Sequence, residues 1–379
     1  MSVIFEAENY RGLKKVRWAP SGVCALVGPN GSGKTTLLRL GGLFRYTVER
    51  TLNEGLAVSG GSLGLKHFDA KDTDSITLRA TLDSSSYQLR IQHTGFGIEV
   101  EESFFCGSTR ILHRPFLASR FEFDGQSLPI DLDRMCLKLV ADRFDDQRVV
   151  PVLTGLRQYR TYRDYRIEYL RDSGSATTGE TVLSLQGANV FSVLRNVRDN
   201  FGSRDRFQFI MAAMRTAFPG AFHDLAFSTS GPRTHAMFLS RIGSDALPFS
   251  SAPNGVLCGL LHLVAVVCGE TPCHIALDEF ENSLHPHAIR SIIGSIREWC
   301  EDKDITVVLA THSPVVMDEF NDEKESLFVM QPGREVQPAA VTELADREWL
   351  DQFALGRLYT GGEIGSPNKG KPKPEPTAA

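Results

Sequence analysis

Short runs of alternating hydrophobic and polar residues open the chain and predict β-strands. Residues 3–7, 14–18 and 23–27 form such runs, with turns between them. A glycine-rich loop follows the third run, and apolar residues at helical spacing then predict a helix over residues 34–44. Three more alternating runs within residues 75–101, separated by polar turns, predict a hairpin or a meander. The chain therefore begins as an α/β core and continues as an antiparallel β unit.

The rest of the chain divides by the same criteria. The pattern becomes mixed and more polar after the β unit, and strand and helix signals of the first kind resume in the last third of the chain. The final stretch is rich in Gly, Pro and Lys, a composition typical of disordered segments. We expect four regions: an N-terminal half of the core with the β unit (1–103), an insertion or lid region (104–245), a C-terminal half of the core (246–360) and a disordered tail (361–379).

Composition excludes several classes of protein. A hydrophobic share of 42% and a charged share of 23% are ordinary for a globular protein, and the net charge of −5 gives the whole chain no attraction for nucleic acid. The 7 cysteines are scattered without a C-x-x-C pair, which argues against a disulfide framework and a zinc site. The most apolar stretch, residues 256–268, contains His262 and is shorter than the roughly 20 residues of a membrane span. Because no apolar signal segment opens the chain, we expect a cytoplasmic protein without a membrane contact.

The glycine-rich loop fits G-x-x-x-x-G-K-[ST] in the context that this motif requires, after an apolar strand and before a helix. In such a loop the backbone N–H groups face phosphate oxygens, the lysine reaches the β- and γ-phosphates, and the threonine hydroxyl binds Mg²⁺. A plain glycine turn before a helix would need neither the lysine nor the threonine. We therefore expect ATP and Mg²⁺ to bind here, with Lys34 catalytic and Thr35 a metal ligand, through Gly28, Pro29, Asn30, Gly31, Ser32, Gly33, Lys34, Thr35 and Thr36.

Two further apolar runs end in candidate catalytic residues. The first ends at Asp278 and Glu279, which suit a metal ligand and a general base that deprotonates the attacking water. Alone, the same pattern describes a strand end with two solvated acids, but beside a phosphate-binding loop it indicates nucleotide hydrolysis. The second run ends at His312, which can hydrogen-bond the γ-phosphate and sense its loss. The alternative for His312 is a packed loop residue.

Together these residues resemble the ABC-type ATPases of the SMC, RecF and OLD (overcoming lysogenization defect) nuclease group, and most of all the stand-alone AAA-family ATPases of bacterial and phage-defence gene clusters. The strongest cue is D-E-F-E-N-S-L-H-P at residues 278–286, which is similar to that group's D-E-x-E-x-x-L-H-P. The T-H-S-P run at 311–314 and the L-Q-G-A-N run at 185–189 are similar as well, and Gln88 and Gln92 are two candidates for the group's Q-loop glutamine. The resemblance implies an α/β fold, a P-loop NTPase of ABC ATPase type whose mixed sheet carries an antiparallel β subdomain and a helical or mixed insertion.

The resemblance also implies a site shared between two copies of the chain. In the group, a Ser-Asp-Gly signature turn at a helix N-terminus reaches across a homodimer to the partner's γ-phosphate. By position this turn is Pro253, Asn254 and Gly255, so a proline stands where the group has its serine. Either Asn254 or Ser251 would then replace the serine, and we expect slow turnover. A homodimer that closes on ATP follows from the resemblance, and higher oligomers stay open as an alternative.

One stretch of the insertion is basic and aromatic. From Arg157 to Arg171, arginines alternate with tyrosines, a combination that can grip a phosphate backbone and stack on bases. The alternatives are a protein–protein contact, or a solvated face that is packed by tyrosine rings and paired with Asp164 and Glu168. The residues concerned are Arg157, Tyr159, Arg160, Tyr162, Arg163, Tyr165, Arg166, Tyr169 and Arg171.

Aspartates gather in another part of the insertion. They suit either a metal site or a charged surface, and no motif that usually accompanies a metal site stands beside them. The charged surface is therefore favoured for Asp131, Asp133, Asp142, Asp145 and Asp146.

The motifs lead us to expect a regulatory ATPase that senses a cue such as phage infection and controls a separately encoded effector, a nuclease or a toxin. The basis is a complete ATP site without a second catalytic motif in the sequence. The alternative is a RecF-like DNA-binding ATPase of repair or maintenance, with the stretch from Arg157 to Arg171 as its DNA contact. A transporter's nucleotide-binding subunit is disfavoured by the long insertion, the L-H-P run and the replaced signature serine.

Overall fold

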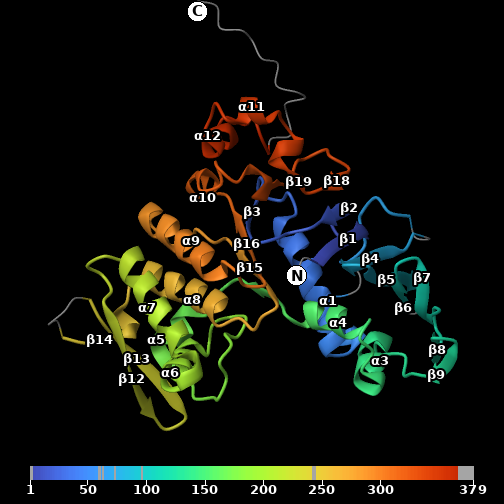
Figure 1. Ribbon diagram of the computed structural model, residues 1–379, viewed down its shortest axis with the longest axis horizontal. Helices are drawn as coiled ribbons and strands as arrows, with labels where there is room; N and C mark the ends of the chain where they lie inside the picture. The colour runs from blue at the N-terminus through green and yellow to red at the C-terminus, as the bar shows by residue number, and fades with distance from the viewer. Residues whose placement is uncertain are drawn as a thin grey trace, which may run out of the picture.

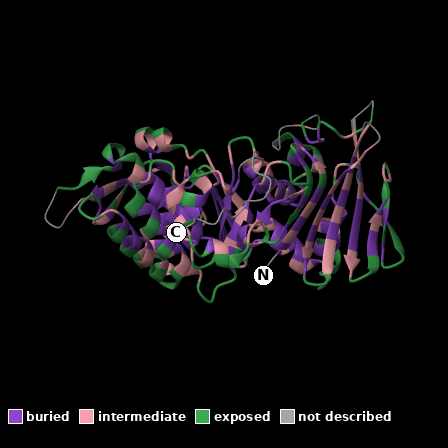
Figure 2. Cartoon of the chain, turned by 90° about the horizontal axis from the view of Figure 1, so that it is seen from above, coloured by how far each residue is buried: buried purple, intermediate pink, exposed green. Residues whose placement is uncertain are grey.

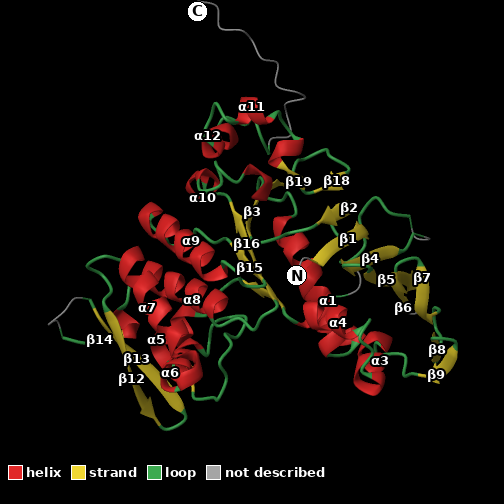
Figure 3. Cartoon of the chain, viewed as in Figure 1, coloured by secondary structure: helices red, strands yellow, loops and turns green. Residues whose placement is uncertain are grey.

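Figure 1 shows a computed structural model of the chain, which describes residues 3–58, 61, 64–71, 74–94, 97–240 and 245–365. The strands of these residues form three sheets. Helices lie between and beside the sheets, as the colours of Figure 3 show. The predicted α/β class with a separate antiparallel β unit is confirmed.

The central layer is a six-stranded sheet. Its order is β10 (Tyr159–Tyr162), β15 (Cys273–Asp278), β16 (Ile305–Thr311), β3 (Val23–Val27), β17 (Leu327–Val329) and β19 (Ala339–Ala340). The strands pair in parallel, except for the last two. Every residue of β15 and β16 is buried, which is the pattern of a parallel sheet that is covered on both faces.

Alternate residues of the central strands point into two separate cores. In β3, Ala25 and Val27 join one core, and Cys24 and Leu26 join the other. The helices that cover the first core are α6 (Val190–Asp199), α7 (Arg204–Ala217), α8 (Asn254–Val267), α9 (Pro286–Cys300) and α10 (Pro314–Asp318). The second core is closed by α1 (Lys34–Glu49), α2 (Leu52–Val58), α3 (Cys136–Phe144) and α4 (Val150–Arg157). The predicted first helix thus continues beyond residue 44.

A nine-stranded sheet completes the second core. Its order is β18 (Val336–Gln337), β2 (Leu13–Trp18), β1 (Val3–Tyr10), β4 (Ile76–Leu82), β5 (Ser85–Thr94), β6 (Gly97–Cys106), β7 (Thr109–Arg114), β8 (Arg120–Phe123) and β9 (Gln126–Pro129). Every second residue of β4 is buried, and Figure 2 shows this alternation along several strands of the sheet. The predicted strands at the start of the chain and the predicted meander are therefore present.

The third sheet belongs to a mixed lobe on the far side of the central sheet from the nine-stranded one (Figure 1). A hairpin of β12 (Asp224–Ser230) and β13 (Arg233–Leu239) forms its centre, and β11 (Ser175–Ala176) and β14 (Leu247–Pro248) also pair with β13. The helix α5 (Ile167–Ser173) precedes β11. The ring of Phe249 packs against Phe191 and Phe238, with ring centroids 5.2 and 5.5 Å apart. This packing ties the chain just before α8 to the lobe.

The predicted regions do not coincide with structural units. The boundary predicted at residue 103 lies inside β6, whose pairing with β5 continues on both sides of it. Within the predicted insertion, β7, β8 and β9 extend the nine-stranded sheet, and β10 is an edge strand of the central sheet. The separate lobe begins only at α5. A change in local polarity suggested the boundary at 103, whereas strand pairing determines where the units end.

The C-terminal end also differs from the prediction. Two short helices, α11 (Arg347–Leu350) and α12 (Leu355–Thr360), end the predicted C-terminal half of the core. The region predicted to be disordered begins as packed chain, because Ile364 is 3% exposed and the Gly365 N–H donates to Oε1 of Gln331 at 3.0 Å. The rest of that predicted tail, residues 366–379, lies outside the described residues.

Two expectations from composition can be compared with the structure. Among the described residues, none of the helices has both the length and the apolar character that a membrane crossing requires. All 7 cysteines are free thiols, in agreement with the absence of a disulfide framework.

Candidate active site

The glycine-rich loop joins β3 to α1 in a conformation that strongly favours glycine. Gly28, Gly31 and Gly33 have φ angles of 154°, 78° and 100°. A Cβ on Gly28 would lie 2.8 Å from Cβ of Met330, and a Cβ on Gly33 would lie 2.7 Å from Cδ2 of Leu13. The loop leads into the N-terminus of α1, which has no side-chain cap. Its backbone N–H groups are therefore available to an anion.

Lys34 connects this loop to the end of β16. Its Nζ donates to the carbonyl oxygen of Gly28 at 2.7 Å and lies 2.7 Å from Nε2 of His312. The residue is 7% exposed, and burial lowers the pKa of its ammonium to about 8, against the opposing effect of the nearby carboxylates of Asp278, Glu281 and Glu279. Lys34 therefore stays mainly protonated at pH 7.

His312 is neutral in this contact. Its pKa is lowered first by burial and then by the charge of Lys34. An ammonium group can only donate hydrogen bonds, so Nε2 of His312 is the acceptor and the ring proton lies on Nδ1. That Nδ1 is 3.5 Å from the hydroxyl oxygen of Tyr359 in α12. Tyr359 had no sequence signal, because α12 contacts the site only through the tertiary fold.

Thr35 and Asp278 form an oxygen pair that fits Mg²⁺. The hydroxyl of Thr35 donates to Oδ2 of Asp278 at 2.9 Å. The Asp278 side chain is 2% exposed, and burial raises the pKa of its carboxyl while the Thr35 hydroxyl and the Arg163 charge act in the opposite direction. Hydroxyl and carboxylate oxygens are the hard ligands that Mg²⁺ prefers. Nε of Arg163 lies 3.7 Å from the same Oδ2, a neighbour that the sequence did not indicate.

Glu279 and Glu281 occupy different positions beside this pair. Glu279 is exposed, has a φ of 56°, and accepts a hydrogen bond from Nδ2 of Asn282 at 2.6 Å. Glu281 accepts hydrogen bonds from the Thr311 hydroxyl at 2.8 Å and from the His312 N–H at 2.7 Å. Glu281 therefore fixes the strand end that carries His312. The D-E-x-E motif contains this residue, but only the structure shows its role.

One cavity of about 400 Å³ brings together most of the predicted residues of the loop and the two strand ends, but Gly28 and Pro29 are not among the residues that line it. It is lined by residues 30–36 together with Asp278, Glu279 and His312. The chain matches the family described as "AAA domain, putative AbiEii toxin, Type IV TA system" over residues 23–135 and 137–318, which is more than half of its length. The chain belongs to this AAA domain family.

Several solved structures that resemble this AAA domain are SMC heads. The SmcHead bound to the C-winged helix domain of ScpA has a TM-score of 0.46 at 12% identity, over 83% of this chain and 90% of that chain. The SMC head domain from Thermotoga maritima has a TM-score of 0.39 at 13% identity, over 86% and 94%. The Smc head domain with an extended coiled coil, bound to the C-terminal domain of ScpA derived from Pyrococcus furiosus, has 0.44 at 13%, over 84% and 91%. No curated protein matches the chain.

The predicted signature turn of the AAA domain lies outside the cavity of the glycine-rich loop. Asn254 and Gly255 are the first residues of α8, and Pro253 precedes them without a side-chain cap. A Cβ on Gly255 would lie 2.6 Å from the carbonyl oxygen of Ser283, so the turn packs closely against the loop that follows Glu279. The structure thus places the turn beside the D-E-x-E loop and outside the cavity that Lys34 lines.

The two candidates for the missing signature serine differ in their contacts. The Ser251 hydroxyl donates to the carbonyl oxygen of Pro248 at 2.7 Å and is engaged within its own turn. Asn254 is exposed, and its Oδ1 accepts a hydrogen bond from Nη2 of Arg171 at 2.6 Å. With Oδ1 occupied, the Nδ2 amide of Asn254 is the free end of the side chain and can only donate.

Neither glutamine proposed for the Q-loop lines the cavity of the glycine-rich loop. Gln88 and Gln92 both lie in β5, and the Gln88 side chain is hydrogen-bonded within the β4–β5 hairpin. Gln186 instead lines a neighbouring cavity together with Thr35 and Asp278. Its sequence signal is the L-Q-G-A-N run, which by itself does not connect Gln186 with Thr35 and Asp278.

The first tyrosines of the arginine and tyrosine stretch are packed in the protein interior. Tyr159 and Tyr162 are each 1% exposed, and the Tyr165 hydroxyl oxygen lies 3.1 Å from Nδ1 of His262 in α8. Buried rings cannot stack on bases, so the structure favours the packed face over a nucleic-acid grip. The ion pairs expected of such a face are present, at 3.3 Å between Arg163 and Asp164 and at 3.8 Å between Arg171 and Glu168.

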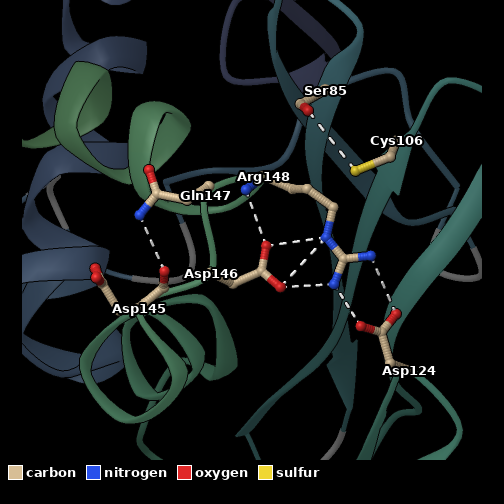
Figure 4. A network of polar contacts seen from close by, with 7 residues as sticks. All are labelled: Ser85, Cys106, Asp124, Asp145, Asp146, Gln147 and Arg148. Atoms are coloured by element: carbon tan, nitrogen blue, oxygen red, sulfur yellow. Dashed lines mark hydrogen bonds and ion pairs between the residues drawn. The ribbon is translucent and has the colours of Figure 1, made fainter.

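Three of the five aspartates of the acidic cluster, Asp131, Asp142 and Asp146, form ion pairs with arginines of the protein itself. Arg148 donates to Asp146 at 2.9 Å and also pairs with Asp124, as Figure 4 shows, and these hydrogen bonds lower the pKa of Asp146. Within the part of the chain that the structure describes, no three His, Cys, Asp or Glu side chains form a metal-binding group. The metal interpretation is therefore wrong for these residues. The other contacts of the cluster are Asp131 with Arg134 at 3.5 Å, Asp142 with Arg157 at 3.9 Å, and Asp133 with the N–H of Asn53 at 3.1 Å.

A second cavity, of about 690 Å³, adjoins the other side of the glycine-rich loop. Residues of the β1–β2 turn, residues 67–69 and the turn at 332–335 line it together with Pro29, Asn30, Gly31 and Ser32. Phe68 is 81% exposed and stacks on His67, with ring centroids 4.3 Å apart. An exposed ring beside a phosphate loop offers a face to a planar base. The sequence did not reveal this cavity, because its residues come from separate segments without a shared motif.

Proposed function

We propose that this AAA domain binds MgATP and hydrolyses it slowly, as a switch that dimerises with the nucleotide. The observation that carries the proposal is the convergence of Lys34, Thr35, Asp278, Glu279 and His312 on one cavity, although they come from three distant parts of the chain. This set combines a phosphate-binding cation, oxygen ligands for Mg²⁺, a base and a neutral imidazole, which are the parts that nucleotide hydrolysis requires.

Each side chain of the set has a role that its contacts support. Lys34, protonated at pH 7, would bind the β- and γ-phosphates, whose oxygens would then replace His312 as its partner. His312 would thereby register whether a γ-phosphate is present. Thr35 and Asp278 would hold Mg²⁺, which when bound neutralises phosphate charge. Glu279, exposed beside them, would take the proton from the attacking water.

A second copy of the chain would complete the site. Asn254 and Gly255 lie at the exposed N-terminus of α8, outside the chain's own phosphate cavity. We infer that the Nδ2 amide of Asn254 takes the place of the signature serine and donates to the γ-phosphate that the partner binds. Ser251 is disfavoured because its hydroxyl already donates to Pro248. The α8 N-terminus would add backbone N–H groups to the same phosphate.

The cavity beside Phe68 would hold the adenosine part of the substrate. It shares Pro29, Asn30, Gly31 and Ser32 with the phosphate loop, so a nucleotide could extend from one cavity into the other. The exposed Phe68 ring would stack on the base. Lys14 and Asp69 are polar groups of the same cavity that would contact the base or the ribose.

We further propose that the switch acts in the cytoplasm and regulates a separately encoded effector of an anti-phage system. The family description, which names a putative toxin and a TA system, supports this setting, and free thiols on all 7 cysteines suit a reducing compartment. A RecF-like DNA-binding role is the alternative. The burial of Tyr159 and Tyr162 speaks against the arginine and tyrosine stretch as its DNA contact.

The first experiment compares ATP turnover and molecular size for the wild-type chain and Glu279→Gln, with and without MgATP. We expect the wild type to turn over, and the variant to lose at least about 100-fold in turnover, because a general base contributes roughly 10²- to 10⁴-fold. The variant should accumulate as a dimer or larger assembly with MgATP. Glu298→Gln, an exposed glutamate on α9, is the matched control and should behave as the wild type. A wild type with neither turnover nor an ATP-dependent change in size would contradict the proposal.

A second experiment tests the regulatory role. Proteins encoded beside this chain would be co-expressed with it and with Glu279→Gln, and association would be measured with and without MgATP. We expect one of them to bind the ATP-trapped variant at least about tenfold more tightly than the nucleotide-free chain, a change typical of coupled sites. Association of equal strength with and without MgATP would contradict regulation by the switch. ATP turnover stimulated by DNA, with a steep salt dependence, would favour the RecF-like alternative.

A further inference from the structure

A third cavity adjoins Thr35 and Asp278, next to the cavity of the glycine-rich loop. Its volume is about 430 Å³, and it lies between α1, β10 and the residues that follow β10. Thr35 and Asp278 line both this cavity and the cavity of the phosphate loop. Three arginines line it as well, Arg39 and Arg45 from α1 and Arg163 from the end of β10. The function proposed above uses none of these arginines.

Two groups in this cavity are buried without a hydrogen-bond partner of normal geometry. The Tyr159 hydroxyl belongs to a residue that is 1% exposed, and although the Thr161 side chain is a polar neighbour, the two form no hydrogen bond of normal geometry. Arg45 is 13% exposed at its side chain, and although its Nε donates to Glu49 at 3.1 Å, its Nη1 has no partner there. Buried polar groups are almost always hydrogen-bonded, so two unpaired donors in one cavity mark a place for a ligand that accepts hydrogen bonds.

The arginine nearest the metal-binding pair is also incompletely bonded. Nε of Arg163 lies 3.3 Å from Oδ2 of Asp164 and 3.7 Å from Oδ2 of Asp278, but it forms a hydrogen bond of normal geometry with neither. Asp164 is exposed and lies at the edge of the cavity. The Nε end of this guanidinium is therefore held between two carboxylates by charge, and a stronger acceptor could redirect it.

We propose that this cavity binds a phosphate-bearing small molecule of mononucleotide size, separate from the MgATP of the phosphate loop. Guanidinium groups match phosphate geometry with paired N–H donors, and three of them converge here against two carboxylates. The rings of Tyr46 and Tyr159 and the side chains of Leu43 and Leu185 supply the apolar walls that the rest of such a molecule requires. The volume falls within the range of small-molecule sites.

Occupancy of this cavity couples to the metal-binding pair, and this part of the proposal rests on the proposed MgATP site. A phosphate group that draws Arg163 toward itself moves a cation away from Asp278, and the carboxylate is then free for Mg²⁺. The ligand therefore strengthens MgATP binding, and MgATP strengthens ligand binding by the same factor. An increase of about 5-fold or more is expected, in the usual range of such coupling.

The test titrates the full chain with labelled AMP, and in a second arm with inorganic pyrophosphate, by equilibrium dialysis. It is done with the phosphate loop saturated by a non-hydrolysable ATP analogue and Mg²⁺, and again with Lys34→Ala and no analogue. We expect saturable binding of one probe per chain in both settings. A preference for AMP would identify a nucleotide as the ligand, and equal binding of both probes would identify the phosphate group alone.

Three variants locate the binding. Tyr159→Phe removes only the unpaired hydroxyl and keeps the packed ring, so it should fold and bind the probe about tenfold more weakly, the effect of one lost bond to a charged ligand. Arg45→Ala should weaken binding at least as much. Arg17→Ala changes an arginine of β2 whose side chain is 69% exposed and which lies outside the cavity, so this variant should bind the probe as the wild type does.

The outcomes separate this proposal from the proposed function. No saturable binding of either probe, or binding that Tyr159→Phe and Arg45→Ala leave unchanged, would overturn the site. If the ATP analogue does not bind, the proposed MgATP function fails, while probe binding to the chain on its own still decides the present proposal. If the probe binds but the affinity for MgATP does not change, the proposed coupling is overturned, whereas the proposed binding site still stands.

Discussion

The guanidinium of Arg171 donates a hydrogen bond of 2.6 Å to Oδ1 of Asn254, across 83 positions of sequence. The same guanidinium donates to the carbonyl oxygens of Ser250 and Ala252, at 2.5 and 2.6 Å. One side chain of α5 therefore holds the whole turn that begins α8. It also fixes the direction of the Asn254 amide, because the oxygen end of that amide is occupied.

From this clamp we predict that Arg171→Ala impairs closure of the dimer more than nucleotide binding by one chain. The turn would lose three hydrogen bonds to a charged donor, each of which contributes about 1.5–3 kcal/mol. We expect kcat to fall at least about tenfold and the ATP-dependent change in size to be lost, with nucleotide affinity of the single chain within about threefold of the wild type. Arg171→Lys should recover only part of the loss, since an ammonium lacks the planar fork of the guanidinium.

The matched control for the clamp is Arg166→Ala. Arg166 belongs to the same stretch, is exposed, and lies over the ring of Tyr169 with its guanidinium carbon 5.5 Å from the ring centroid. It makes no hydrogen bond to the turn among the contacts described. Equal loss in Arg166→Ala and Arg171→Ala would show that the stretch acts as a whole and that the clamp has no role of its own.

The affinity for MgATP should fall as the pH rises above about 8. The pKa of Lys34 is about 8 in the free chain, because burial disfavours its charge. Bound phosphates would favour the ammonium, so the pKa is higher in the complex, and binding takes up a proton above pH 8. We expect Kd to rise by up to about tenfold between pH 8 and 9, measured by calorimetry. Lys34→Arg cannot deprotonate, so its weaker binding should show no such slope, and a slope as steep as the wild type's would refute the assignment.

Glu281→Gln should slow turnover through His312. The carboxylate accepts from both the Thr311 hydroxyl and the His312 N–H, and an amide oxygen with an adjacent NH₂ cannot replace both acceptors. We expect kcat to fall about tenfold with KM little changed, because one buried donor loses its partner at a cost of about 1–3 kcal/mol. The pKa of His312 should fall further, since the Glu281 charge raises it. An NMR titration of His312 reports this directly, and an unchanged titration would contradict a positioning role.

Two adjacent glycines of α1 should respond in opposite directions to alanine. A Cβ on Gly41 would lie 2.4 Å from ring atoms of Tyr159, and that ring is packed against Phe5 with centroids 5.4 Å apart. Overpacking costs about 1–3 kcal/mol and exceeds the roughly 1 kcal/mol that alanine gains in a helix, so Gly41→Ala should destabilise the fold. Gly42 has nothing within 4 Å of its Cβ position, and Gly42→Ala should stabilise by up to about 1 kcal/mol. Urea unfolding measures both, and a stabilised Gly41→Ala would show that the Tyr159 ring can move.

The parts of this protein that sequence alone predicted are those with local signals. The phosphate loop was predictable because strand, loop and helix follow one another without interruption in the sequence. Asp278 and Glu279 were predictable because an apolar strand that is buried on both faces shows as a continuous hydrophobic run. His312 ends the neighbouring strand for the same reason.

The tertiary structure decided whatever depends on which segments pack together. Lys34 meets His312 across 278 positions, and no local pattern encodes that the strands β3 and β16 are neighbours. The stretch from Arg157 to Arg171 looks like a basic surface in the sequence, yet pairing of β10 with β15 buries Tyr159 and Tyr162 and leads Arg163 to Asp278 and Arg171 to Asn254. Charge and aromatic content are properties of composition, whereas exposure depends on strand pairing and packing. Sequence therefore predicted the candidate residues of the glycine-rich loop and of the two strand ends, and only the fold determined which further side chains, such as Arg163 and Tyr359, lie beside them.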